Sequence, residues 1–296
     1  MKKLLLIVLA VLVTSSAYAV GTCNWVVSPS NVVFGIYSPF GSGTLSATSG
    51  LSFECTPPTT GTVTFTTGVN SATYFPRYMA TGGNLIGYNL YENAANTVVL
   101  GDGTGGTATF SFTASPANRQ FAGTIYASTP LGADVPPGTY TDTVTAILSW
   151  DAQSSSVTFT VTTVVQAECT VSTIAVAFGN YDPVAAHAAS PLDGTGTVNV
   201  YCTPGTSVTV SLGDGLYFAG GMRRMAGPLT SFLDYQLYRE PARSSIWSTT
   251  PNTVSGTSTS VLTPIGGGLV VYGRVPGGQD VRAGLHADTV QATVNY

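Results

Sequence analysis

The chain has 296 residues, of which only 8% are charged, and its fourteen acidic residues outnumber its ten basic ones. A net charge of −4 and the lack of any Lys or Arg cluster exclude a partner that is recognised by positive charge, such as nucleic acid or an anionic membrane. Thirty-four Gly residues and abundant Thr, Ser, Val and Tyr favour many short strands joined by turns.

Residues 1–19 are predicted to be a secretory signal peptide. Two lysines precede an apolar run over residues 4–13, and the small-residue motif Ala17-Tyr18-Ala19 follows it. The run is shorter than the roughly 20 apolar residues of a membrane helix, and no later run approaches that length. We therefore expect cleavage before Val20 and export of the mature chain through the periplasm.

Four cysteines in a chain that is expected to be exported predict disulfide bonds. Cys23 and Cys55 are 32 residues apart, and Cys169 and Cys202 are 33 residues apart. Three pairings are possible, and the near-equal spacings favour one bond within each half. A loop of this size stabilises a fold by about 3 to 4 kcal/mol in the chain-entropy model.

The two halves of the chain repeat each other at an offset of about 146 residues. Besides the cysteines, the matching landmarks are Phe34-Gly35-Ile36-Tyr37 with Phe178-Gly179-Asn180-Tyr181, Tyr88-Asn89-Leu90-Tyr91 with Tyr235-Gln236-Leu237-Tyr238, and Asp142-Thr143-Val144 with Asp288-Thr289-Val290. Their constant order indicates that the two halves have the same fold.

Each half is predicted to be an all-β domain, with strands near the cysteines, at residues 63–67 and 208–212, and at the Tyr-x-Leu-Tyr motifs. The last strands are expected at residues 143–150 and 289–296, where apolar residues alternate: Val144, Ala146, Leu148 and Trp150 in the first half, and Val290, Ala292, Val294 and Tyr296 in the second. Two immunoglobulin-like β-sandwich domains in tandem are the predicted fold.

One strand, at residues 154–166, occurs only once. Val157, Phe159, Val161 and Val165 alternate with polar residues, as in a half-buried strand. We expect residues 156–166 to complete a first domain at 20–166, whereas the second domain, at 167–296, has no counterpart after Tyr296. The second sandwich would then lack its last strand, and an apolar groove beside Val290, Ala292, Val294 and Tyr296 would need a strand from another chain.

Several motifs resemble the spore coat protein U family: the early cysteine, Phe-Gly-x-Tyr, Arg223-Arg224-Met225-Ala226, Tyr-Gln-Leu-Tyr, Val271-Tyr272-Gly273-Arg274-Val275-Pro276 and the closing Asp-Thr-Val. The resemblance is close over residues 167–296. It is looser over residues 20–150, where the Arg-Arg-Met-Ala site reads Arg77-Tyr78-Met79-Ala80.

This family includes the subunits of archaic, Csu-type chaperone-usher pili. The resemblance implies that a periplasmic chaperone fills the groove first, and that an outer-membrane usher exchanges it for the N-terminal strand of the next subunit. It also implies a two-domain tip adhesin at the cell surface, whose first domain mediates attachment and biofilm formation. The alternative is a secreted structural coat or minor fibre subunit without a receptor of its own.

Two regions of the first half are candidates for contact with an unknown receptor or surface. Loops near residues 55–61, 92–106 and 150–155 are expected at the free pole, and their apolar residues are Pro57, Pro58, Val98, Val99, Leu100 and Trp150. The second region is the aromatic cluster of Tyr74 and Phe75 beside Arg77. For both regions, an ordinary structural role in strands or core is the competing interpretation.

Catalysis and cofactors find little support. His187 and His286 are the only histidines and both lie in the second half, which excludes a His-dependent triad or His metal site from the first. No spacing singles out a pair of carboxylates, and the Gly-rich runs follow no strand-to-helix pattern. We therefore predict a protein that is not an enzyme and that has no cofactor, metal or nucleic-acid partner.

Overall fold

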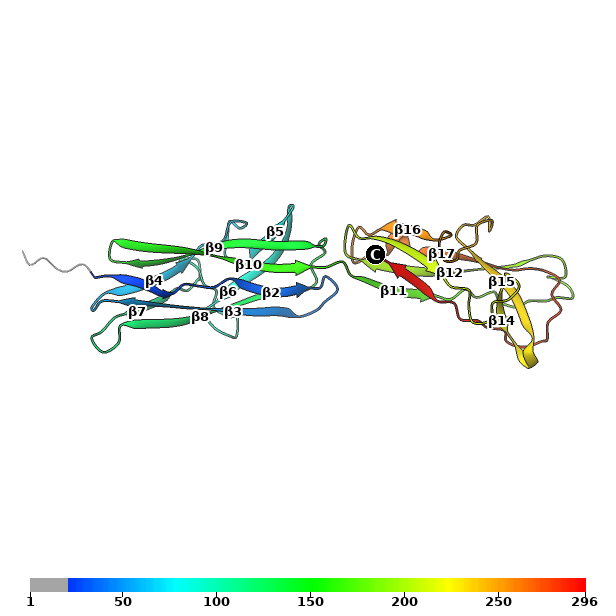
Figure 1. Cartoon of the computed structure of the whole chain (residues 1–296), viewed down its shortest axis with the longest axis horizontal. Coiled ribbons are helices and arrows are strands. Elements are labelled where there is room, and N and C mark those ends of the chain that lie inside the picture. The colour runs from blue at the N-terminus through cyan, green and yellow to red at the C-terminus, as the bar shows by residue number, and fades with distance from the viewer. Residues whose placement is uncertain (1–20) are drawn as a thin grey trace, which may run out of the picture.

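The computed structural model describes residues 21–296, so the predicted signal peptide lies outside the described residues. Two β-domains lie end to end along the long axis of the molecule, and the chain passes from one to the other after strand β10 (Figure 1). Apart from two short 3-10 helices, Pro228–Thr230 and Ile265–Gly267, the regular structure of these residues is all strand. None of their helices is long and apolar enough to span a membrane.

The first domain consists of ten strands. They are β1 Cys23–Val27, β2 Val32–Tyr37, β3 Thr44–Cys55, β4 Thr60–Phe65, β5 Arg77–Thr81, β6 Asn84–Tyr91, β7 Phe110–Thr113, β8 Gln120–Pro130, β9 Gly138–Trp150 and β10 Gln153–Val165. They form one curled sheet in the order β1-β3-β8-β6-β5-β9-β10-β2, and β4 joins β9 to β7.

The second domain has eight strands. They are β11 Cys169–Ile174, β12 Leu192–Cys202, β13 Ser207–Leu212, β14 Arg223–Ala226, β15 Phe232–Tyr238, β16 Val254–Thr257, β17 Leu269–Val275 and β18 Ala292–Asn295. One sheet has the order β11-β12-β17-β15-β14, and the other has the order β16-β13-β18. The prediction of an all-β chain with two immunoglobulin-like domains is confirmed.

Each domain surrounds its own apolar core. The first core contains the aromatic rings of Phe53, Phe65, Phe110 and Phe159, which come from both layers of the curled sheet. The second core is smaller and is centred on the fully buried Trp247, whose indole N–H donates to the Val210 carbonyl. Two separate cores give each domain its own source of hydrophobic stability.

The disulfide bonds join Cys23 to Cys55 and Cys169 to Cys202, which confirms the pairing within each half. In both domains the bonded cysteines lie directly opposite each other on neighbouring antiparallel strands. The two bonds therefore tie the first strand of each domain to the strand beside it.

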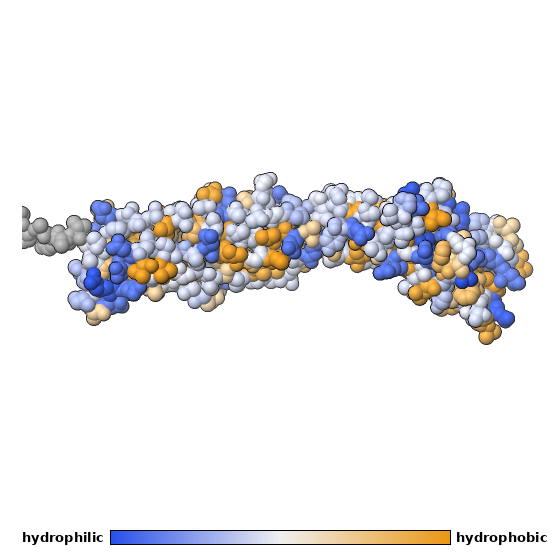
Figure 2. Space-filling view, in the orientation of Figure 1, coloured by the Kyte–Doolittle hydropathy of each residue, from blue (hydrophilic) through white to orange (hydrophobic). Residues whose placement is uncertain are grey.

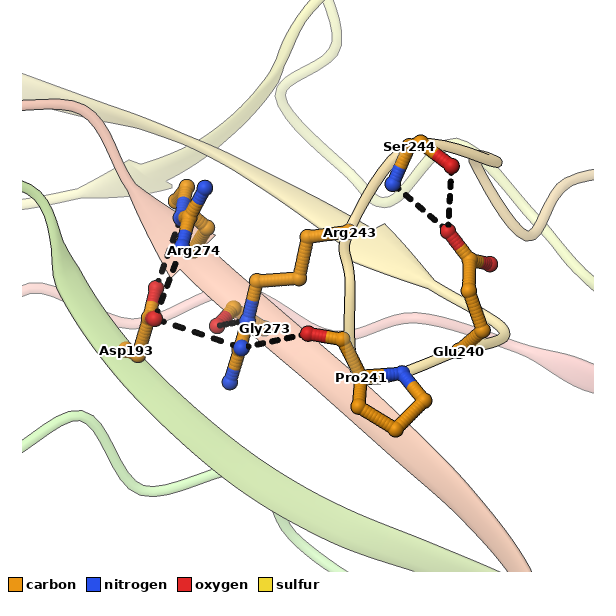
Figure 3. A network of polar contacts seen from close by, with 7 residues as sticks. All are labelled: Asp193, Glu240, Pro241, Arg243, Ser244, Gly273 and Arg274. Carbon is orange, nitrogen blue, oxygen red and sulfur yellow. Dashed lines mark hydrogen bonds and ion pairs between the residues drawn. The ribbon is translucent and has the colours of Figure 1, made fainter.

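A polar network holds the connection between β15 and β16 against the sheet of the second domain (Figure 3). Asp193 of β12 accepts hydrogen bonds from Arg274 of β17 at 2.7 and 2.9 Å, and it forms an ion pair with Arg243 of the connection at 3.2 Å. The hydrogen bonds from Arg274 lower the pKa of Asp193. Because these groups are partly exposed, the network orients the connection more than it stabilises the domain.

A buried arginine occupies the same place in both domains. Arg77 donates to the carbonyls of Thr66 and Leu100 and to Asn89 Oδ1, at 2.6 to 3.1 Å. Arg223 repeats this pattern with Gly213, Trp247 and Gln236. Burial lowers the pKa of both guanidinium groups, which nevertheless stay protonated at neutral pH.

We predict that Arg77→Met destabilises the first domain by roughly 2 to 5 kcal/mol, because it leaves buried acceptors without a donor. Arg119→Met, at an exposed arginine of the same domain, is the matched control. Thermal and urea unfolding of the full chain measure the difference. A loss below about 1 kcal/mol would contradict the structural role of Arg77.

Candidate functional site

In the first domain, strand β10 lies between β9 and β2. It pairs antiparallel with β9 over thirteen residues, from Gln153 opposite Trp150 to Val165 opposite Gly138. On its other side it pairs parallel with β2, with Val161 opposite Val32 and Val165 opposite Tyr37. Over residues 161–165 both edges of β10 are therefore paired with a strand, and Phe159, Val161 and Val165 are buried in the core.

In the second domain, no strand of the described residues takes this place. Strand β18 pairs with β13 on one side, and its other edge has no strand partner among residues 21–296. Residues 176–181, which match β2 in the repeat, form no strand. A cavity of about 450 Å³ lies between the two segments, and its lining includes Ile174, Val176, Phe178, Leu212, Met225, Tyr235, Leu237, Val271, His286, Asp288, Val290 and Ala292. We call it the groove.

The apolar side chains of β9 are more deeply buried than their counterparts in the second domain. The β9 residues Val144, Ala146 and Leu148 are fully buried. Their counterparts in the second domain, Val290, Ala292 and Val294, are apolar in the same way but only half-buried. Since the residue types are nearly the same, the exposure of the second set follows from the lack of a strand beside β18.

A tyrosine and an aspartate form the same hydrogen-bonded pair in both domains. The Tyr88 hydroxyl donates to Asp142 Oδ2 at 2.6 Å, and the Tyr235 hydroxyl donates to Asp288 Oδ2 at 2.7 Å. Burial, then the hydrogen bond and charge of Asp288, raise the pKa of Tyr235, so its hydroxyl remains the donor. Asp142 is buried opposite Val161 of β10, whereas Asp288 lines the groove.

One histidine stands at the groove. His286 lines it, and its Nε2 lies 3.3 Å from Ser231 Oγ. His187 instead stacks on Tyr181 in the connection before β12, with the ring centroids 5.2 Å apart. Residues 21–296 contain no cluster of three or more His, Cys, Asp or Glu side chains that could hold a metal. The groove is thus an apolar cleft with a hydrogen-bonded Tyr–Asp pair in its lining.

The predicted border of the groove is only partly the one that the structure has. Val290 and Ala292 line the cavity, but Val294 and Tyr296 do not, and Tyr296 is 62% exposed. Residues 289–291 are not in a strand, so the last strand is shorter than expected. Sequence reasoning missed the opposite wall, residues 173–178, although the match of Phe178 to Phe34 was available to locate it.

The candidate receptor loops do not all lie at the free pole. Pro57 and Pro58 lie between β3 and β4, and Trp150 ends β9, at the pole where β10 begins. The loop at residues 92–106 was expected at the free pole, and this expectation is wrong. The loop lies along the side of the domain, where the Gly101 carbonyl accepts a hydrogen bond from Phe65 N–H. Val99 and Leu100 are buried there and Val98 is half-buried, because Arg77 binds the Leu100 carbonyl.

The aromatic candidates lie on the side of the first domain. The half-buried Tyr74 donates its hydroxyl to the Phe65 carbonyl, and the Arg77 guanidinium lies 4.9 Å from its ring centroid. Phe75 is 55% exposed and lines a shallow cavity of about 350 Å³ with Tyr91 and Pro130. Tyr74 therefore has a structural contact, and Phe75 is the more accessible of the two rings.

Comparisons with known proteins agree with the repeat. A model of the Spore Coat Protein U domain matches the chain twice, over residues 9–147 and 155–293. Protein U of Myxococcus xanthus is 40% identical over 132 residues, which are 40% of this chain and 70% of that protein. The second match begins inside β10, so this strand leads the second family unit while it lies in the first domain.

A solved structure, CsuC-CsuE, supports the fold, and a second solved structure, CupB6, is a weaker match. The chaperone-tip adhesion subunit pre-assembly complex CsuC-CsuE, from archaic Csu pili of Acinetobacter baumannii, matches with a TM-score of 0.53 at 15% identity, over 93% of this chain and 100% of that chain. The CupB6 tip adhesin from Pseudomonas aeruginosa matches with a TM-score of 0.42 at 8% identity, over 94% of this chain and 95% of that one.

We predict that amide hydrogens of residues 290–294 exchange at least about tenfold faster than those of residues 144–148 in the full chain, because β18 has one paired edge and β9 has two. Hydrogen–deuterium exchange read by NMR or mass spectrometry makes the comparison within one molecule. Equal protection of the two segments would show that the groove is closed in solution.

Proposed function

The chain belongs to the Spore Coat Protein U domain family, and from that membership we propose that it is the tip adhesin subunit of a chaperone-usher pilus. The second domain joins the fibre by accepting a β-strand from the next subunit, and the first domain attaches the fibre to a receptor or surface. The observation that carries the proposal is the contrast between β10 in the first domain and the groove in the second.

Strand β10 acts as a donor strand within its own chain. It leads the second family unit, as the family match from residue 155 indicates, yet it pairs with β9 and β2 of the first domain. The strand addition that joins two subunits of a fibre is thus present once inside this molecule, where a strand of the second family unit completes the first domain. The second domain, built on the same repeat, needs the same kind of strand from outside the described residues.

The groove fits an extended apolar strand. Burying three residues like Phe159, Val161 and Val165 contributes about 5 to 9 kcal/mol before the cost of ordering the strand. Pairing along the free edge of β18 adds backbone hydrogen bonds, which is recognition by β-strand addition. By analogy with β10, the donor runs antiparallel to β18 and parallel to residues 176–181.

In this proposal the groove is occupied by two partners in turn, first a chaperone and then the strand of the next subunit. An exposed apolar groove and an open strand edge favour aggregation, so a periplasmic chaperone covers them after export. An outer-membrane usher then replaces the chaperone with the strand of the next subunit. The likeness to a chaperone-tip adhesin complex supports the chaperone step. In this proposal the chain lies outside the cell at the end of the pilus.

Adhesion is assigned to the free pole of the first domain. There Pro57, Pro58 and Trp150 stand at the turns before β4 and β10, at the end of the molecule opposite the groove-bearing domain (Figure 1). This pole is farthest from the fibre, where attachment and biofilm formation would require a contact. The ligand is a protein, a glycan or an inert surface.

A structural role is the second candidate. The 40% identity to Protein U favours a coat or minor fibre subunit that uses the same groove without a receptor of its own. Gold-labelled antibody against the first domain, applied to intact fibres, is expected to mark one end only. Label along the length of the fibres would contradict the tip position and favour the structural role.

We predict that a peptide with the sequence of residues 153–166 binds the full chain and raises the melting temperature of the second domain, because the groove repeats the surroundings of β10. A peptide with Asp at the positions of Phe159 and Val161 is the control for apolar burial. The substitution Ala292→Arg, inside the groove, is expected to abolish binding, whereas Thr293→Arg, on the exposed face of the same strand, leaves it intact.

Calorimetric titration and thermal melting give the result. If the second domain gains no stability from the peptide, or if both substitutions act alike, the strand-acceptor role is wrong.

A further inference from the structure

The end of the second domain farthest from the first carries exposed apolar side chains (Figure 2). We call it the distal end, and it consists of residues 182–191, 227–231 and 276–288. Val184, Leu229 and Leu285 stand there, one in each segment, and they are 87, 77 and 84% exposed. The groove opens at the distal end, because His286 and Asp288 belong both to the lining of the groove and to the distal end.

Hydrogen bonds join the three segments into one surface. Arg282 N–H donates to Ser231 Oγ at 3.1 Å, and Gly278 N–H donates to the His187 carbonyl at 2.8 Å. The apolar residues are thus presented by connections that hold one another in place. Large exposed apolar side chains gathered at one end of a domain mark an interaction surface.

The matching end of the first domain shows what such a surface contacts. There the second domain docks directly, since only residues 166–168 separate β10 from β11. Asp134 Oδ1 accepts a hydrogen bond from Val261 N–H at 2.9 Å, and Ser38 Oγ donates to Glu168 Oε2 at 2.7 Å. The domain that supplies the strand therefore rests on the domain that receives it.

Equivalent residues make the same hydrogen bonds at the distal end of the second domain. The Tyr37 hydroxyl donates to the Pro130 carbonyl at 2.9 Å and accepts from Ala133 N–H at 2.8 Å. Tyr181 makes the same two bonds, at 3.0 and 2.9 Å, with Pro276 and Gln279. The residues that follow Ala133 and Gln279 are Asp134 and Asp280, and Asp280 is exposed.

We propose that the distal end docks the body of the subunit that donates its strand, in the arrangement that the second domain has on the first. Asp280 accepts a backbone N–H of that subunit, as Asp134 accepts Val261 N–H within this chain. The occupant is a domain of the same fold, whose strand lies in the groove a few residues away. This inference rests on the strand-acceptor role proposed above.

One difference between the two ends sets the partner's chemistry. Asp182 takes the place of Ser38, and its Oδ1 already accepts from the N–H groups of Val184 and Ala185. A glutamate like Glu168 in the partner's linker would meet a like charge, which disfavours docking. The partner's linker therefore carries a neutral or basic residue at that position.

A single extended chain tests the docking. A second copy of residues 151–296 follows Tyr296, with Glu168 of the copy changed to Gln, and residues 151–166 follow the copy. The second domain and its copy are then each followed by a β10 strand that can fill the groove, and Val261 of the copy faces Asp280. Spin labels on the second domain and on the copy are expected to give a distance distribution as narrow as labels on the first and second domains.

Two substitutions separate docking from strand insertion. Asp280→Ala is expected to broaden that distribution and to speed amide exchange at Val261 of the copy about fivefold, the equivalent of one hydrogen bond. Asp134→Ala should do the same at the first junction, and Glu54→Ala, at an exposed glutamate of β3 near the free pole, should change neither.

The outcomes are distinct. If residues 290–294 become protected but the distribution stays broad and Asp280→Ala has no effect, the docking proposal is wrong and the strand-acceptor role stands. If residues 290–294 remain unprotected in the extended chain, the strand is not accepted, and both proposals fall together.

Discussion

The pairing of β9 with β10 is the interaction on which the rest of the structure depends. A strand inside a sandwich has two edges of backbone donors and acceptors, and each edge needs a partner or water. In the first domain β10 satisfies one edge of β9 over thirteen residues and shields Val144 and Ala146 from solvent. In the second domain β18 pairs on one side only, and the same apolar positions become the wall of a groove.

The internal repeat separates residues that build the fold from residues that serve function. Arg77 and Arg223 bind carbonyls in both domains, and the Tyr–Asp pair is made twice, so these groups belong to the common fold of the two domains. Features that differ between the halves carry the functional argument: β10 occurs once, and Val184 and Leu285 are exposed at the distal end. A buried arginine beside an aromatic ring would otherwise have suggested recognition of a ligand.

Local patterns predicted the parts of this structure that depend on local physics. The alternation at Val157, Phe159 and Val161 identified a strand, and the near-equal cysteine spacings favoured the disulfide pairing that the structure has. The burial of Leu100 could not be read in this way, because its loop is fixed by Arg77, a residue 23 positions earlier in the chain. The second wall of the groove depends likewise on how residues 173–178 lie across from β18, which no periodicity encodes.

The covalent connection of β10 to β9 explains why the first domain folds without a partner and the second domain does not complete itself in the same way. A strand joined to β9 by a two-residue turn has an effective concentration of roughly millimolar or more, so the first domain closes without a partner. In the proposed function the second domain receives its strand from another molecule, and its stability then depends on the concentration and affinity of that donor. Burial of a few residues like Phe159 is comparable to the net stability of a whole domain, about 5 to 15 kcal/mol. In that proposal, strand insertion and folding of the second domain are one coupled event, which makes the second domain the one that needs a chaperone.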